Sequence, residues 1–169
     1  FTYKENKQAA DDLIRSINAK NIFAEAVDIT DETSVRGVVD RALKEFGKID
    51  ILVNNAGIWE YGKIGEMSFE NWKRTLSINL DSVFLFTNSV VPLIKNQKSG
   101  TIIHISSTAA QRGEAEHSHY AASKGAINSF TKSLASELGP FGITANAVAP
   151  GWVDTDMCTE VFSDINYKK

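Results

Sequence analysis

The sequence predicts an α/β fold built on a doubly wound parallel sheet. Short apolar runs alternate with longer stretches in which apolar residues recur at helical spacing. The short runs lack the apolar–polar alternation of a half-exposed strand, as a parallel sheet covered by helices on both faces requires. A chain of 169 residues, of which 43% are hydrophobic, has the length of one domain with its own core. We therefore expect residues 1–169 to form a single domain.

The first part of the chain predicts strand, helix, strand, helix and strand in turn. Residues 1–3 are typical of the end of a strand, and residues 9–17 carry apolar side chains at helical spacing. The apolar run 22–27 predicts the second strand. Residues 31–47 predict a helix, because acidic residues stand at its start and a glycine ends it. The β-branched run 49–53 predicts the third strand.

Two helices are expected next. Ser68 is a suitable N-cap for a helix that we expect to end near Asn79. Residues 82–94 predict a second helix, in which Pro92 marks a kink or the last turns. The loop between the third strand and Ser68 is expected to border the substrate.

The last part of the chain predicts strand, loop, helix and strand. Residues 101–105 form an apolar run, and residues 109–118 predict a polar loop. A helix over 120–138 has one apolar stripe and stops at a Gly-Pro pair, and the strand 143–148 follows. The face of this helix opposite the apolar stripe has small residues, which favours close packing against a partner subunit.

Composition and charge argue against several classes of protein. The net charge of −3 and the scattered Lys and Arg residues give no basic surface for nucleic acid. The sequence has no apolar run of about eighteen residues and no secretory pattern at its N-terminus. Cys158 is the single cysteine, which fits a reducing compartment. We therefore expect a cytoplasmic protein that binds neither nucleic acid nor a membrane.

Three polar side chains are expected to meet after the strand 101–105. Tyr120 and Lys124 are four residues apart, which places them on the same side of a helix, one turn apart. A neighbouring ammonium stabilises a phenolate, so we expect Lys124 to lower the pKa of Tyr120. Ser107 follows the strand, at the edge where open α/β sheets place their sites. These residue types indicate a proton-transfer site.

Five sequence elements, taken together, resemble the short-chain dehydrogenases/reductases that consist of a single domain. The Tyr-x-x-x-Lys spacing alone is weak, because helices produce it by chance, but all five elements stand in the family's order and spacing. They are Asn54-Asn55-Ala56-Gly57, Asn79, Ser107, Tyr120 with Lys124, and Pro150-Gly151-Trp152-Val153-Asp154-Thr155.

The resemblance implies a role for each of four catalytic residues. Tyr120 would be the general acid for a carbonyl oxygen as hydride arrives from a nicotinamide, or the base in the oxidative direction. Lys124 would lower the pKa of Tyr120 and hold the nicotinamide ribose. Ser107 would bond to the substrate oxygen, and Asn79 would anchor a water that links Lys124 to solvent.

The resemblance also implies which positions border a nicotinamide dinucleotide. They fall into three groups: two positions on the adenine side, three in the turn beside the adenosine ribose, and four in the segment near the nicotinamide. Tyr120 and Lys124 belong to the cofactor site as well. In the same order, the three groups are Asp28 and Ile29; Asn54, Ala56 and Gly57; and Pro150, Gly151, Val153 and Thr155.

The resemblance favours NADP over NAD, although both stay open. An acidic residue at the end of the family's second strand binds the ribose hydroxyls of NAD, whereas a neutral or basic residue leaves room for the 2′-phosphate of NADP. Lys4 follows the strand here and is a candidate contact for that phosphate. Glu5, the next residue, keeps NAD as the alternative.

Two departures from the family concern its outer segments. The Gly-rich turn that binds the pyrophosphate and the family's first strand do not precede residues 9–17, and the family's last strand does not follow Lys169. We expect the sequence to be part of a protein of about 250 residues, as the family's size implies. Without the first strand, the sheet would divide into two halves with open edges.

The resemblance is greatest to the 3-oxoacyl-[acyl-carrier-protein] reductases, and two alternatives stay open. One is a sugar or polyol dehydrogenase of the same family, such as a glucose 1-dehydrogenase. The other is a non-catalytic remnant that serves as an interaction module through the helices 82–94 and 120–138. In the family these helices pair between subunits, which implies a homodimer or homotetramer. The loops 58–66 and 109–118 and the residues beyond 156 would contact the substrate.

Several of these residues also have an ordinary structural explanation. Asp28 suits the turn before a helix, Asn79 suits a helix end, and Ser107 suits a strand-end serine that caps local backbone. His117 and His119 stand close to Glu114 and Glu116, but without a third ligand at a familiar spacing they predict a solvated polar loop rather than a metal site.

Overall fold

The strands form two separate parallel sheets in the computed structural model, which describes residues 1–17 and 21–159. Strand β1 (Thr2–Tyr3) pairs with β2 (Glu25–Ala26). The larger sheet has the order β3-β4-β5, and all its pairs are parallel. Its strands are β3 (Ile51–Asn54), β4 (Gly100–Ile105) and β5 (Ile143–Val148).

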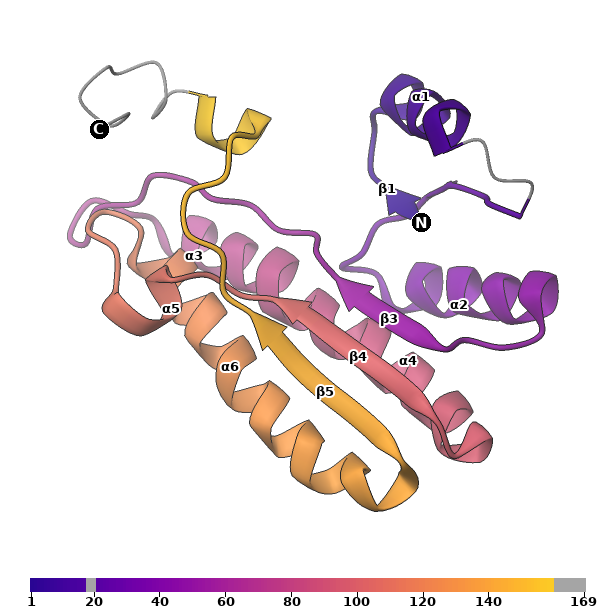
Figure 1. The fold of residues 1–169 in the computed structure, drawn as a ribbon. Helices are drawn as coiled ribbons and strands as arrows, with labels where there is room; N and C mark the ends of the chain where they lie inside the picture. Colours follow the sequence, from indigo (N-terminus) through magenta and orange to yellow (C-terminus); the bar gives the residue numbers. More distant parts are fainter. Residues whose placement is uncertain (18–20, 160–169) are drawn as a thin grey trace.

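Helices connect the parallel strands, as Figure 1 shows. The α/β class and the parallel arrangement are therefore confirmed. The helices are α1 (Lys7–Ile17), α2 (Glu32–Phe46), α3 (Phe69–Leu76), α4 (Ser82–Gln97), α5 (Ala109–Arg112) and α6 (Ser118–Leu138), and 3-10 turns cover Gly139–Phe141 and Asp156–Cys158.

Local capping signals fix the ends of α2 and α3 where the sequence predicts them. The Asp31 carboxylate accepts a hydrogen bond of 2.7 Å from the Ser34 amide at the start of α2. Gly47 ends this helix with φ of 76°, a left-handed conformation that glycine adopts without strain. The Ser68 hydroxyl accepts a bond of 3.1 Å from the Asn71 amide at the start of α3.

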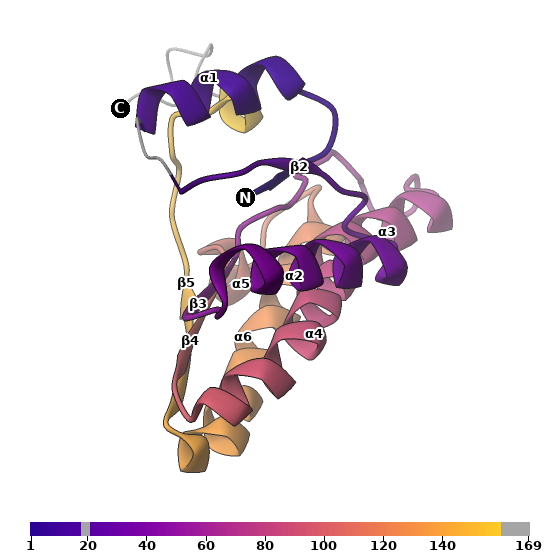
Figure 2. The same cartoon turned by 90° about the vertical axis from the view of Figure 1, so that its right-hand side faces the viewer.

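One connected core lies between the larger sheet and three helices. Figure 2 shows α2, α4 and α6 on the same side of β3, β4 and β5. Their apolar side chains pack against alternate residues of β4 and β5, which point to that side. The buried members of this core are Val39, Val90, Ile94, Ile102, Leu134, Leu138, Ile143 and Ala145.

On the larger sheet, the described helices cover one face only. Residues of the opposite face stay accessible, including Ile51 at 60% and Val53 at 53% exposure. The strands are apolar on both faces, and for that reason the sequence predicts helices on both. The described helices α2, α4 and α6 all pack on the same face.

The two helices expected over residues 68–94 form one continuous helical segment. A π-helical turn, Ser77–Asp81, joins α3 to α4, and the Ser82 amide donates to the Ser77 carbonyl across it. Asn79 therefore lies within a helix rather than at a helix end, which corrects the expectation. The segment also continues past Pro92 to Gln97. Likewise, the expected polar loop 109–118 contains the short helix α5.

This long segment is apolar enough to be noted as a candidate membrane span. Within Phe69–Gln97 a window reaches a mean hydropathy of 1.3 and is 33% buried. By length and composition alone, such a helix passes the criterion, as the core helix of a water-soluble protein also does. Val83, Val90 and Ile94 on this segment are buried against the rest of the protein.

The division into two sheets agrees with the expectation that the resemblance implies. A hollow of about 1020 Å³ lies between the smaller and the larger sheet. Phe1 and Thr2 line it from one side, and residues 51–54 of β3 line it from the other. Among the described residues, β3 pairs with a strand on one edge only.

Candidate active site

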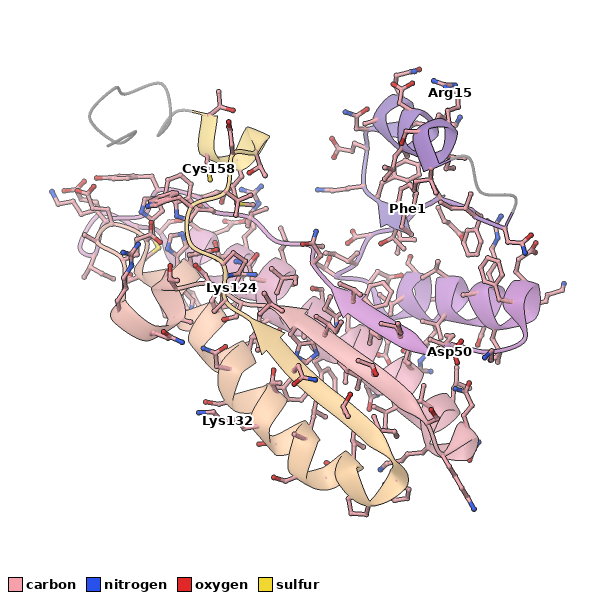
Figure 3. All side chains as sticks on the ribbon, in the orientation of Figure 1. Phe1, Arg15, Asp50, Lys124, Lys132 and Cys158 are labelled. Atoms are coloured by element: carbon pink, nitrogen blue, oxygen red, sulfur yellow. The ribbon has the colours of Figure 1, made fainter. Side chains whose placement is uncertain are left out.

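Ser107, Tyr120 and Lys124 line one cavity of about 620 Å³. Ser107 follows β4 at its carboxyl end, and the other two residues lie on α6. Figure 3 shows Lys124 close to the end of the sheet, beneath the segment that leaves β5. The structure thus brings the three predicted residues together.

Backbone hydrogen bonds on both sides fix Ser107. The Ser106 amide donates to the Val148 carbonyl (2.7 Å), and the Thr108 amide donates to the Pro150 carbonyl (3.0 Å). The Ser107 hydroxyl accepts a bond of 3.1 Å from the Ala109 amide and also bonds with the Tyr120 hydroxyl. Ser107 therefore caps local backbone and contacts the phenol as well.

Lys124 is held by the end of β4. Lys124 is only 4% exposed. Its ammonium donates a hydrogen bond of 2.7 Å to the Ile105 carbonyl and lies 5.8 Å from the centroid of the Tyr120 ring. The buried Ser106 hydroxyl donates to the Lys124 carbonyl (3.0 Å), which fixes α6 against the strand. Burial lowers the pKa of Lys124 to about 8, because the charged form loses solvation.

The pKa of Tyr120 differs from the sequence-based expectation. Burial raises it above the ordinary value, and the hydrogen bond with Ser107 opposes this effect only in part. Lys124 is not among the groups that lower it. The Lys124 ammonium instead bonds to the Ile105 carbonyl. The phenol therefore keeps its proton at neutral pH.

Asn79 reaches the site from the π-helical turn and binds the backbone after β3. Its side-chain oxygen accepts from the Ile58 amide (2.7 Å), and its amide group donates to the Ile58 carbonyl (2.9 Å) and the Ser123 hydroxyl (3.2 Å). A Cβ added to Gly57 would lie 3.2 Å from Asn79 Oδ1 and 3.4 Å from Lys124 Nζ. The backbone at Gly57 can approach both side chains because it has no Cβ.

Most of the predicted cofactor positions line two adjoining hollows. Asn55 and Ala56 line both the site cavity and the larger hollow between the sheets. Ile29 and Asn54 lie on the larger hollow. The remaining positions that line the site cavity are Gly57, Pro150, Gly151, Val153 and Thr155. The two hollows therefore meet at Asn55 and Ala56, just after β3, and we call the pair the groove.

Lys4 and Asp28 do not line either hollow. The Asp28 carboxylate accepts bonds from the Thr30 amide (2.9 Å) and hydroxyl (2.6 Å), as expected of a residue in the turn before α2. These bonds lower the pKa of Asp28, and Lys4 lowers it further. The exposed Lys4 ammonium lies 3.6 Å from the Glu5 carboxylate.

Aromatic and charged side chains of the loops form further walls of the cavity. Trp59 donates a hydrogen bond of 3.2 Å to Glu114, stacks on His117 at 4.1 Å and meets the edge of Trp152 at 5.9 Å. Trp59, Glu114 and His117 lie in the expected substrate loops, but side-chain identity alone does not indicate which loop residues face the cavity. Others on its wall are Arg112, Met157 and Cys158.

The expectation of a solvated loop around the histidines is wrong for His119. Its side chain is fully buried, and neither ring nitrogen has a hydrogen-bond partner within the described residues. Burial lowers its pKa. In the part of the chain that the structure describes, no group of three or more His, Cys, Asp or Glu side chains could hold a metal ion.

Comparisons with known proteins agree with this geometry. The family model described as short chain dehydrogenase matches residues 1–166. The chain is 38% identical over 157 residues to a 3-oxoacyl-[acyl-carrier-protein] reductase of Synechocystis, with 92% of this chain and 64% of the relative covered. It is 37% identical to the reductase FabG of Escherichia coli, with 96% and 65% covered. The chain thus spans about two thirds, or slightly less, of the curated relatives' length.

Solved structures give the same result. A short-chain dehydrogenase from Streptomyces avermitilis superimposes with a TM-score of 0.85 at 29% identity, covering 92% of this chain and 57% of that one. An NAD⁺-bound xylitol dehydrogenase also superimposes with a TM-score of 0.85, at 30% identity, covering 95% and 63%. The chain therefore belongs to the short-chain dehydrogenase family.

Proposed function

We propose that the full-length protein is an NAD(P)-dependent oxidoreductase that transfers hydride between a nicotinamide and a carbonyl or secondary alcohol. The observation that carries this proposal is the convergence of Ser107, Tyr120 and Lys124 on one cavity at the carboxyl end of a parallel sheet. The adjoining groove along Asn55 and Ala56 fits an elongated dinucleotide. When bound, the nicotinamide supplies or accepts the hydride.

Tyr120 holds the proton that the reaction needs. In the reductive direction, the phenol gives its proton to the carbonyl oxygen as the carbon gains hydride, and the product is the alcohol. The raised pKa of Tyr120 supports this role, since the phenol is protonated at neutral pH. Ser107 orients the same oxygen by a hydrogen bond. Lys124 would bind the nicotinamide ribose, and Asn79 would hold the turn at Ile58 and a water in the proton path.

The test is hydride transfer by the full-length protein with a panel of ketones, 3-oxoacyl thioesters and sugars, each with NADPH and NADH. We expect Tyr120→Phe to lower kcat about 100-fold or more, as loss of a general acid does, and to keep nucleotide affinity. Tyr61→Phe is the matched control, because it removes a phenol that does not line the cavity. A Tyr120→Phe variant with most of its rate would contradict the proton-donor role.

We propose NADP as the preferred cofactor, with NAD as the alternative. Lys4 follows β1 and supplies a cation for a 2′-phosphate, although Glu5 and Asp28 lie near it. We expect Lys4→Ala to weaken NADPH binding about tenfold and to leave NADH binding unchanged, as loss of one charged contact implies. Lys7→Ala is the control, since the Lys7 ammonium pairs with Asp11 at 2.9 Å. Equal changes for both nucleotides would argue against Lys4.

The first candidate substrate class is 3-oxoacyl-[acyl-carrier-protein], because the curated relatives have that activity in their names. A polyol or sugar is the second candidate. The xylitol dehydrogenase supports it, as does Trp59 with Glu114 on the cavity wall, where a ring and a carboxylate suit a polyhydroxylated chain. The substrate panel separates the two classes.

We also propose that the protein forms a homodimer or homotetramer through α4 and α6 in the cytoplasm. Phe84 on α4 is 50% exposed in the single chain. Small residues on α6, expected on the face opposite its apolar stripe, would permit close approach of a second helix. They are Ala121, Ala122, Gly125 and Ser129. The non-catalytic alternative, an interaction module, would keep the oligomer and show no turnover in the same assays.

A further inference from the structure

A chain of buried polar side chains connects the groove to the core beneath the sheet. Asn54 at the end of β3 donates a hydrogen bond of 3.3 Å to the Thr87 hydroxyl on α4. Thr87 Oγ1 lies 3.4 Å from His104 Nε2 on β4, and His104 Nδ1 lies 2.9 Å from the Thr131 hydroxyl on α6. Asn54 is 9% exposed and the others 5% or less.

The direction of each hydrogen bond follows from one backbone carbonyl. Thr131 Oγ1 lies 2.7 Å from the Ile127 carbonyl oxygen, which only accepts, so the hydroxyl proton must lie between the two oxygens. The Thr131 oxygen can then only accept from His104, so Nδ1 of His104 carries the proton and donates it. A neutral imidazole then has an unprotonated Nε2, which accepts the proton of the Thr87 hydroxyl.

The same order fixes the amide of Asn54. The Thr87 hydroxyl donates its hydrogen bond to His104, so its oxygen can only accept the bond from Asn54. The amide nitrogen Nδ2 of Asn54 must therefore face Thr87. The carbonyl oxygen Oδ1 of Asn54 then points away from the chain of bonds. Asn54 lines the larger hollow, beside Asn55 and Ala56 that border both hollows. Among the described residues, no hydrogen bond to this oxygen occurs.

We infer that His104, acting through Thr87, is a positioning residue that holds Asn54 with its carbonyl oxygen presented to the nucleotide. An acceptor at this place suits a ribose hydroxyl or the amino group of an adenine, both of which donate. The inference rests on the proposed function, because it assigns a purpose to one wall of the nucleotide groove.

The His104 ring is itself held in place. It stacks on Phe130 with centroids 5.7 Å apart and ring planes 3° apart, and its side chain is fully buried. A ring that cannot turn can transmit an orientation from Thr131 to Thr87. If the residues served only the stability of the core, the proton order would have no consequence for the nucleotide.

The decisive variants are at Thr87, in the full-length protein. Thr87→Val keeps the shape and removes the hydroxyl, which frees the Asn54 amide to turn. We expect it to raise the Kd for the preferred nucleotide about tenfold, as loss of one oriented hydrogen bond implies, and to leave kcat at saturation unchanged. Thr87→Ser restores the hydroxyl and should bring the Kd back to within about twofold of the wild-type value.

Thr75→Val is the matched control. Thr75 is also fully buried on the same helical segment, and its hydroxyl has no partner within the described residues. Its loss should leave the Kd unchanged. An equal rise in Kd for Thr75→Val and Thr87→Val, or no rise for Thr87→Val, would overturn the inference.

Two nuclear magnetic resonance measurements test the orientation without any nucleotide. The ¹⁵N shifts of His104 should identify the Nδ1-protonated tautomer, and the Asn54 side-chain amide should exchange with water much faster in Thr87→Val than in the wild-type protein. An Nε2-protonated ring would overturn the inference. If the wild-type protein bound no nucleotide, the proposed function would fail, and the inference that rests on it would fail with it. If His104 had the expected tautomer but the nucleotide Kd did not change in Thr87→Val, the inference would fail and the proposed function would stand.

Discussion

The phenol of Tyr120 and the ammonium of Lys124 are both shifted toward their neutral forms. Burial raises the pKa of Tyr120 and lowers the pKa of Lys124 to about 8. A neutral phenol is ready to donate a proton, whereas the oxidative direction needs the phenolate. Any nucleotide hydroxyl that drew the Lys124 ammonium toward Tyr120 would favour the phenolate by charge. The apparent acidity of the site is therefore expected to depend on nucleotide binding.

His104 makes the stability of the protein depend on pH. Burial lowers its pKa to about 4 from the ordinary value of 6.5, so between these values the unfolded chain binds a proton that the folded chain does not. Unfolding free energy should fall as the pH drops from 6.5 toward 4, by up to about 3 kcal/mol in total. Chemical denaturation at several pH values measures this dependence.

His104→Asn is the comparison for this experiment, because it removes the titrating group. The absolute stability of the variant matters less than its slope with pH. We expect the slope between pH 4 and 6.5 to decrease. An unchanged slope would assign the pH dependence to other groups.

At the scale of single elements, α2 contains a glycine with room for a side chain. A Cβ added to Gly37 would meet nothing within 4 Å, although Gly37 lies in the interior of the helix. Gly37→Ala should raise the unfolding free energy by about 1 kcal/mol, because alanine restricts the unfolded chain and favours the helix. Thermal or urea denaturation measures the change.

Gly47→Ala is the contrasting variant on the same helix. A Cβ there would also find open space, but φ of 76° places the residue in the left-handed region. We expect a loss of about 1 kcal/mol from this strain. If Gly37→Ala and Gly47→Ala changed the unfolding free energy in the same direction, the explanation from backbone conformation would be wrong.

The sequence predicts those parts of the elements that depend on local signals. The N-caps Asp31 and Ser68 and the end at Gly47 lie where capping rules place them. The π-helical turn Ser77–Asp81 has no such local signal, and for that reason α3 and α4 were expected to be separate. The bounds of β5 are as predicted, whereas those of the other strands shift by one to three residues, most at the start of β2, because pairing with a neighbour decides them.

The sequence predicts which three side chains meet at the cavity, but it does not predict their pKa values. Ser107, Tyr120 and Lys124 meet as expected, since spacing and strand order determine their place. The pKa of Tyr120 depends on how deeply the ring is buried, which no local pattern gives. The burial of His119 and the hydrogen bond between Trp59 and Glu114 likewise depend on tertiary contacts.

At the scale of the whole molecule, the two sheets leave backbone edges and an apolar face open. Ile51 and Val53 are more than half exposed on β3, whose outer edge lacks a neighbouring strand in the described residues. We expect the polypeptide of residues 1–169, produced alone, to be marginally stable and to aggregate, because open edges pair with other chains. Light scattering and urea denaturation would measure both properties.

The same polypeptide should not bind NADPH with micromolar affinity, since the groove borders the open hollow between the sheets. The full-length protein is the control, and it should bind the nucleotide. Tight binding by residues 1–169 would contradict the view that the groove needs both sheets in one continuous layer. It would also show that the described residues suffice for recognition.

The widened turn at Ser77–Asp81 absorbs one residue more than a regular α-helix would use, so the stretches before and after it keep their faces toward the interior. Asn79 stands on that extra turn, while Val83, Val90 and Ile94 stand on the regular stretch beyond it. A single-codon deletion there would straighten the helix and keep the buried face of the regular stretch, but it would also leave the Ile58 backbone and the Ser123 hydroxyl without their bonds to Asn79. The extra residue therefore ties the order of the loop after β3 to the shape of this helix.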